Sequence, residues 1–576
     1  MTRRHPEYRM PVSRRQFLTY LGVGVPVAFA GGGASGGPAA FPAPRRRGEP
    51  PAFFKPIEPS SRDELVLPAG FRADVVVRWG DALGSKAPDG TAELFGFNND
   101  FVAYFPIDAL TGGANAAEGL LWVNHEYPNP VFVSGYSEAD AKAGRKKLVE
   151  QIVKEKLSVG GSVIHVKRGE GGWKPVAGSK YNRRLTAAYP EVALTGPAGV
   201  LGPANGTLAN CSGGVTPWHT TLSCEENYPD YNAAGPYGYR WTDVPGMGID
   251  EKKYGWVVEV DPFGELPPVK HTALGRFKHE NAAVRVGPKG RLVVYMGDDE
   301  ADQHLYKFVS ENPVKAGASR AEKRKVLESG TLYAADLANG KWVPLRYTPE
   351  NAKKFKESRA FAAAAEAEKK AGGTLAIESQ ADVLTFARFA ARALGATPLD
   401  RCEDCEVHPL DGSLYVALTN SVGHGNLHGH ILRLVEDRDD PEGESFRYEV
   451  FLAGGPQSGL SCPDNLAFDR AGNLWVVCDI SSNKLGTGAY KPFANNGVFV
   501  VPTAGDSAGD AFQFASGPVE CEVTGPCFTP DESTLFLSVQ HPGEESKSLT
   551  ELTSHWPDGG DTAPRPAVVA ITGFRQ

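Results

Sequence analysis

The stretch CPDNLAFDRAGNLWVVCDI, residues 462–480, contains the pattern that decides the fold. Asp464 is followed by a short apolar run at 465–468, a polar turn at 469–473 and a second apolar run that starts at Leu474. Two apolar runs joined by a short polar turn are typical of a β-hairpin. The stretch therefore predicts two adjacent antiparallel strands, with Asp464 at the start of the first.

The second half of this pattern, an apolar strand opened by Leu, recurs along the chain. It is found at residues 120–126, 220–226, 290–299, 411–420, 471–480 and 532–541. Six such units, most of them without a regular helix between them, indicate a repeat architecture. We predict an all-β fold, a six-bladed β-propeller. Because the spacing between the units is uneven, we expect insertions in the blades. A large β-sandwich is the alternative.

The largest insertion separates the third and fourth units. Residues 349–371 are rich in Ala, Lys and Glu, and 379–393 carry apolar residues at helical spacing after a capping residue, Ser379. We expect a helical insertion at about 349–395 that packs outside the blades, with its aromatic residues in the core.

The N-terminus carries an export pattern. The pair Arg14 and Arg15 precedes an apolar run at 21–30, which ends in the small-x-small sequence Ala28-Phe29-Ala30. This order resembles a twin-arginine (Tat) signal. We expect a signal at 1–30, a flexible linker at 31–60 and the propeller at 61–576, in a periplasmic or secreted protein that uses the Tat machinery. Tat substrates cross the membrane already folded. A cell uses this route chiefly when a cofactor must be inserted before export, so the signal itself indicates a metal.

Composition excludes several function classes. The formal net charge is −9 for the 576 residues, and removal of 1–30, with five arginines and one glutamate, makes it −13. No basic face is available for nucleic acid. No apolar run of 18 or more residues follows the N-terminus, so we expect no membrane span in the mature form, which we expect to be a monomer. The surplus of acid suits a site that holds cations.

Acids stand at a fixed distance ahead of the strands. Glu280, Glu403, Asp464 and Glu522 lie ten to thirteen residues before the Leu of their units, and in the second unit Cys211 takes this place. In a propeller they would meet at one end of the channel, where like charges repel unless cations lie among them. Carboxylates suit Ca²⁺, Mg²⁺ or Mn²⁺, and a thiolate favours iron or zinc. The pattern predicts a multinuclear site with more than one kind of metal. Acids that merely cap turns are the alternative.

Further acids follow the second strand of several units. Asn124, His125 and Glu126 follow the first of these strands, Glu225, Glu226 and Asn227 the second, and Asp298, Asp299 and Glu300 the third, and Asp479 stands at the end of the fifth. Any single one of them is also compatible with a solvated loop. We expect at least one calcium ligand in the sequence MGDDEADQ, with Asp299 favoured over Asp298.

Long motifs carry a family resemblance. The sequences at 206–228, 275–282, 295–310, 393–409, 462–469 and 522–544, from GTLANCSGGVTPWHTTLSCEENY to EVTGPCFTPDESTLFLSVQHPGE, resemble in this order the PhoX-type alkaline phosphatases. The resemblance implies an exported phosphomonoesterase on a six-bladed propeller, with two Fe³⁺ and three Ca²⁺ ions at the channel mouth.

The resemblance also implies roles for single residues. Arg401 would lie over the phosphate, and Cys211 would bind iron. Apart from the resemblance, Asn210, Lys278 and His279 are candidates to reach the phosphate, with ordinary hydrogen bonds in loops as the alternative. The other implied metal ligands are Glu280, Asp299, Glu403, Asp464 with Asp479 as its rival, Glu522 and Glu126. Two positions depart from the family: Cys402 replaces a proline, and His219 a glycine.

The expected function is hydrolysis of small phosphate monoesters. Paired metals would neutralise the phosphoryl oxygens and lower the pKa of a bound water. Two alternatives stay open: a calcium-dependent propeller hydrolase of lactones or phosphotriesters, and a non-catalytic propeller module held together by metals. The first needs no thiolate such as Cys211, and the second predicts no turnover of p-nitrophenyl phosphate.

Overall fold

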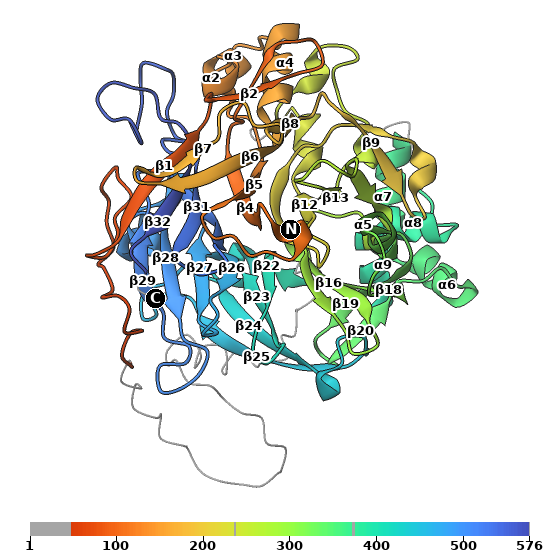
Figure 1. Ribbon diagram of the computed structural model, residues 1–576. Helices are drawn as coiled ribbons and strands as arrows, with labels where there is room; N and C mark the ends of the chain where they lie inside the picture. Colours follow the sequence, from red (N-terminus) through yellow and green to blue (C-terminus); the bar gives the residue numbers. More distant parts are fainter. Residues whose placement is uncertain (1–47, 235–237, 371–374, 575–576) are drawn as a thin grey trace.

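The computed structural model describes residues 48–234, 238–370 and 375–574, which form six β-sheets arranged around a common centre (Figure 1). The predicted export signal lies outside these residues. Numbered from the N-terminus, the first sheet contains β4 (Asn99–Pro106), β5 (Glu118–His125), β6 (Gly160–Gly169) and β7 (Gly172–Pro175), with β8 (Arg183–Leu185) paired to β6. The second contains β11 (Asn210–Val215), β12 (Thr221–Glu225), β13 (Val257–Val260), β14 (Val269–His271), β9 (Glu191–Thr195) and β10 (Ala204–Asn205).

The other four sheets repeat this plan. The third contains β15 (Ala283–Val286), β16 (Arg291–Gly297), β18 (Leu305–Pro313), β19 (Gly330–Asp336) and β20 (Lys341–Pro344). The fourth contains β22 (Cys402–Val407), β23 (Leu414–Leu418), β24 (His430–Glu436) and β25 (Phe446–Ala453), and the fifth β26 (Pro463–Phe468), β27 (Leu474–Cys478), β28 (Gly497–Val501) and β29 (Phe512–Ser516). The sixth contains β30 (Glu522–Phe528), β31 (Thr534–Gln540), β32 (Ala567–Thr572) and β1 (Arg72–Arg78). Two small pairs, β2 (Ala82–Lys86) with β3 (Ala92–Leu94) and β17 (Ala301–Gln303) with β21 (Leu399–Asp400), complete the strands named here.

The innermost strands form a closed ring. β4 contacts β11, and the contacts run on through β15, β22, β26 and β30, which returns to β4. A closed ring of six sheets is a six-bladed β-propeller, so the predicted fold is confirmed and the sandwich alternative is wrong. The six Leu-led strands of the sequence are the second strands of their sheets, β5, β12, β16, β23, β27 and β31. Buried aromatic and aliphatic side chains pack between neighbouring sheets.

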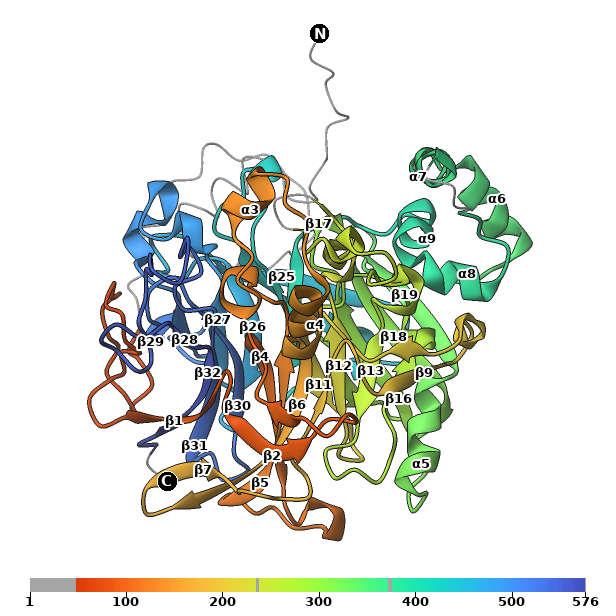
Figure 2. The same cartoon turned by 90° about the horizontal axis from the view of Figure 1, so that it is seen from above.

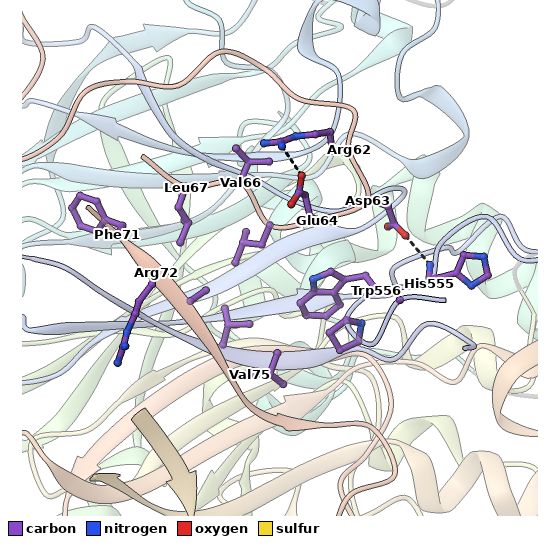
Figure 3. A pocket seen from close by; sticks show the side chains of 15 residues that line it. Arg62, Asp63, Glu64, Val66, Leu67, Phe71, Arg72, Val75, His555 and Trp556 are labelled. Atoms are coloured by element: carbon purple, nitrogen blue, oxygen red, sulfur yellow. Dashed lines mark hydrogen bonds and ion pairs between the residues drawn. The ribbon is translucent and has the colours of Figure 1, made fainter. Parts of the chain in front are cut away.

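The sixth sheet joins the two ends of the described chain. β1 pairs with β32 in antiparallel register, from Arg72 opposite Thr572 to Arg78 opposite Ala567, and the two lie side by side in Figure 1. Figure 3 shows the cavity beside this junction, of about 500 Å³, between the segment that leads into β1 and the loop at 555–559. There Asp63 accepts a hydrogen bond of 2.7 Å from the backbone N–H of His555 (Figure 3).

The described part of the predicted linker packs against the fifth sheet. Phe54 is 6% exposed, and its ring lies 5.4 Å from that of Phe514. The ring of Phe53 stacks on Trp475 at 6.1 Å.

The helical insertion lies outside the third sheet (Figure 2) and contains α6 (Pro349–Glu357), α7 (Arg359–Lys370), α8 (Gln380–Thr385) and α9 (Ala387–Leu394). Each of the two predicted helices is divided, because Ser358 is extended and caps α7, while Phe386 leaves the helical conformation with φ −116° and ψ 41°. Ser379 caps α8 as predicted. Buried residues of α8 and α9 pack into the same core as β18 and β19, which agrees with the structural role expected for this segment.

Short helices α2 (Pro130–Val133), α3 (Glu138–Lys142), α4 (Val149–Ser158) and α5 (Arg320–Lys323) fill other loops. Among the helices of the described residues, none has the length and apolar character needed to span a membrane.

Candidate metal centre

Five of the six innermost strands begin with the same backbone feature. A non-glycine residue with positive φ stands two positions before an acid or a cysteine, and a β-bulge crosses or closely follows that position. Such conformations cost free energy and are retained where they aim a side chain. The pairs are Asn98 (φ 48°) with Asp100, Ala209 (55°) with Cys211, Arg401 (57°) with Glu403, Cys462 (51°) with Asp464, and Glu520 (56°) with Glu522.

We call the acids and the cysteine at the starts of the innermost strands the first tier. A second tier of acids is joined to these strand starts by backbone hydrogen bonds. The residue that follows the second strand donates its N–H to the carbonyl of the positive-φ residue, as in Glu126 to Asn98 at 2.9 Å and Asp479 to Cys462 at 3.0 Å. The third sheet lacks the positive-φ residue, and there the Asp299 N–H donates to the Lys278 carbonyl at 3.1 Å. The second tier therefore presents Glu126, Glu226, Asp299 and Asp479 from four sheets, and Thr419 takes this place in the fourth sheet.

The two tiers line one cavity of about 590 Å³. Arg401 and all eight residues predicted as metal ligands are in its wall: Cys211, Glu280, Glu403, Asp464, Glu522, Asp299, Glu126 and Asp479. The structure therefore brings together residues that are up to 396 positions apart in the sequence.

Three sets of ligand atoms lie close enough to hold a metal ion. They are Asp100–Glu126–Cys211, Cys211–Glu226–Glu280 and Glu280–Glu403–Asp464, and within each set the ligand atoms are within 4.8 Å of one another. Neighbouring sets share Cys211 or Glu280, so the geometry suits several cations side by side. The Cys211 Sγ lies 3.3 Å from both Asp100 Oδ2 and Glu280 Oε1.

The buried acids of this cavity repel one another, and a bound cation would stabilise their charged forms. Burial, followed by the charge of neighbouring acids, raises the pKa of Glu280 and Glu403 well above the usual value. Burial likewise raises the pKa of Asp464 to about 7 and that of the Cys211 thiol well above its usual value. Glu280 Oε2, Asp299 Oδ1 and Asp464 Oδ2 are buried without a hydrogen-bond partner among the described residues. Oxygen ligands for hard cations, together with one thiol, fit a cluster of mixed metals.

Among the described residues, Arg401 is the one arginine in the cavity wall. Its Nη2 lies 2.6 Å from Asp299 Oδ2 and 3.0 Å from Glu403 Oε1, and its side chain is 30% exposed. The guanidinium is therefore held over the acids while part of it faces the cavity.

Two residues expected to reach the phosphate are outside the wall. Asn210 is fully buried and donates to Thr207 and Ser223 at 2.8 Å. Since side chains alternate along a strand, its position next to Cys211 turns it away from the cavity. Lys278 lies 3.7 Å from Glu300 and is not in the wall either.

Sequence reasoning missed Asp100 and left Glu226 unassigned. Asp100 is 1% exposed and occupies the first-tier position of the first sheet. The loop between β4 and β5 is long, so Asp100 stands twenty residues before Leu120, outside the spacing that revealed the other acids. The apolar run at 101–105 directly after Asn99-Asp100 was the available signal.

A buried ion pair supports the second sheet behind the cavity. The Lys270 Nζ lies 2.7 Å from Glu225 Oε1, and both side chains are fully buried. Glu225 also accepts hydrogen bonds from Thr207 and from the backbone N–H groups of Gly255 and Trp256. Glu225 precedes Glu226 in the chain and pairs across strands with Asn210, the neighbour of Cys211. The ion pair therefore joins β14 to β12, and the pairing of Glu225 with Asn210 extends this support to the strand that carries Cys211.

Comparisons with known proteins identify relatives of this chain. A family model described as alkaline phosphatase PhoX matches residues 52–543. A solved structure of Pseudomonas fluorescens PhoX in complex with vanadate, a transition state analogue, matches with a TM-score of 0.74 and 31% identity, over 91% of this chain and 99% of that one.

Other solved structures are much less similar. A gluconolactonase from Xanthomonas campestris has a TM-score of 0.31 and 10% identity, over 92% of this chain and 99% of that one. A Trypanosoma rangeli sialidase has a TM-score of 0.39 and 8% identity, over 88% and 59%. Neither likeness bears on function. A search of curated proteins found no match.

Proposed function

The chain belongs to the PhoX family of alkaline phosphatases and is a phosphoric monoester hydrolase, and from this premise we propose that the two-tiered cavity is its active site and that it works with iron and calcium. The observation that carries the proposal is the convergence of buried acids, one thiol and Arg401 on a single cavity. The Pseudomonas relative binds vanadate, and we expect this cavity to bind it as well.

We assign the ligands by their chemistry. The Cys211 thiolate, shared by two of the three sets of ligand atoms, would hold iron, of which the family resemblance implies two ferric ions. The carboxylates of both tiers would complete the iron site and hold three calcium ions. Glu126, Glu226 and Asp479, at the strand ends, suit calcium because their oxygens are hard ligands. Bound cations would neutralise the phosphoryl oxygens and lower the pKa of an attacking water.

Arg401 would orient the substrate. A planar guanidinium binds two oxygens of a phosphoryl group at once, which a lysine cannot do. Asp299 and Glu403 fix the direction of the Arg401 side chain, so little conformational freedom is lost when it binds phosphate. Phosphoryl transfer depends on such positioning and charge neutralisation more than on covalent chemistry by the protein.

Export is part of the proposal. The pattern at 1–30 supports recognition by the Tat machinery and a periplasmic or secreted enzyme. Small phosphate monoesters would be its substrates, and we propose that it acts as a monomer. An enzyme whose metal ligands come from all parts of the ring must fold before the cluster is complete, which suits a route that exports folded proteins.

Elemental analysis of the exported protein, together with an assay on p-nitrophenyl phosphate, tests the proposal. We expect iron and calcium in the same sample, and loss of turnover when calcium is chelated. Full activity with calcium and without iron would refute the iron assignment and favour the lactone or phosphotriester hydrolase. Metal-loaded protein without phosphatase turnover would favour a binding module.

A further inference from the structure

The outer wall of the active-site cavity contains an unpaired cation. Of the described residues in this wall, only Arg401 and Lys484 carry a permanent positive charge. Arg401 is bound by two carboxylates, whereas the Lys484 ammonium forms no ion pair or hydrogen bond with the described residues. A lysine that faces a cavity without a partner is free to bind an anion there.

Two acids in the same wall as Lys484 have partners of their own. Glu544 accepts hydrogen bonds of 2.6 Å from Tyr127 and from Ser482. The Glu545 carboxylate lies 3.5 Å from the Lys547 ammonium. Glu544 and Glu545 are therefore paired with groups other than the Lys484 ammonium.

The turn that carries Lys484 is fixed in place. The short 3-10 turn η10 (Ser482–Lys484) and Ser481 before it present four consecutive residues to the cavity. Ser482 Oγ bonds to Glu544 and also to the Glu520 carbonyl at 3.0 Å, and both partners belong to loops at the two ends of the hairpin β30–β31. Lys484 is thus held at the wall by contacts to the next sheet.

We propose that Lys484 is a specificity-determining residue that binds the negative charge of phosphomonoesters whose leaving alcohol itself carries a carboxylate or a second phosphate. The inference rests on the proposed function of the cavity. The cleaved phosphoryl group takes the place near Arg401, and a cavity of about 590 Å³ leaves room for the leaving group. Ten acids in the wall repel such a group wherever they are not neutralised, so the single unpaired ammonium decides where its charge can lie.

Matched substrates test the proposal in the metal-loaded enzyme. Phenyl phosphate, 4-carboxyphenyl phosphate and 4-phosphonophenyl phosphate have the same ring, and only the last two carry a second anionic group. In Lys484→Gln we expect the KM of each charged substrate, divided by that of phenyl phosphate, to rise about tenfold, because a hydrogen bond to a charged group is lost. The rise should shrink at high salt, where exposed charges are screened. A larger rise for the phosphonate identifies a second phosphate as the preferred group, and a larger rise for the carboxylate identifies a carboxylate.

Lys491→Gln is the matched control, because Lys491 is exposed, lies seven residues further on and is outside the cavity wall. An unchanged KM ratio in Lys484→Gln, or the same change in Lys491→Gln, overturns the inference while turnover of phenyl phosphate by the wild type leaves the proposed function intact. No hydrolysis of any of the three by the wild type would overturn both.

Discussion

Removal of the Lys270 ammonium is expected to destabilise the protein and to weaken the metal centre. Lys270→Met leaves the Glu225 carboxylate fully buried, with hydrogen-bond donors but without its counter-charge. Loss of one partner of a buried ion pair costs about 3–5 kcal/mol. For a chain of 576 residues, with an unfolding entropy of about 2.1 cal/mol/K per residue, this lowers the Tm by about 2.5–4 °C.

Two companion variants show whether the reasoning holds. Glu225→Gln combined with Lys270→Met removes the stranded charge and should recover at least half of the lost stability in thermal unfolding. Lys307→Met breaks another buried pair, with Glu436, on the third and fourth sheets. It should lower the Tm by a similar amount without changing iron content, whereas Lys270→Met should lower iron content as well. Wild-type stability in Lys270→Met, or no recovery in the double variant, would refute the account.

Four further outcomes are expected. Arg401→Lys should lower kcat/KM for p-nitrophenyl phosphate by about 10²–10³, in line with the loss of a preorganised donor, while iron and calcium stay bound. Cys211→Ser should lose iron, and Cys224→Ser, buried in the same sheet outside the cavity, should retain it. Asp100→Asn should lower the metal content although Asp100 lies outside the spacing of the other acids, and an unchanged metal content would remove Asp100 from the site. Asp464 has a folded-state pKa of about 7 against an ordinary 3.8. The Tm of metal-free protein should therefore fall as the pH rises from about 4 to above 7, because the buried carboxyl loses its proton. Added calcium should reverse this loss in a thermal shift assay.

The fold could be predicted because one hairpin is repeated in nearly constant form. In the fifth sheet the turn between Asp464 and Leu474 is tight, and four other sheets have similar turns, so acids and strands keep their spacing. Asp100 fell outside the pattern only because its hairpin loop is longer. Closure of the ring could not be predicted from the spacing of the units, because it depends on contacts between strands that are far apart in the sequence.

The residues beside the metal ligands were harder to place. Asn210 is next to Cys211 in the chain, but strand alternation turns it towards Thr207 and Ser223. The positive φ of Arg401 and Cys462 also escaped the sequence analysis, because neither arginine nor cysteine is a residue that signals this conformation. Such backbone strain is visible only once the ring that imposes it has formed.

The pairing of β1 with β32 delays completion of the sixth sheet until the end of the described chain has been synthesised. Residues 72–78 leave the ribosome early but find their partner only after 567–572 have been made. At about 5–20 residues per second, the first strand waits about half a minute to two minutes for the last one. During this time the sixth sheet cannot assemble, and Glu522 has no complete blade to hold it. A stop codon just before residue 567 would therefore remove β32, and the sixth sheet would lose the strand that joins β1 to β31.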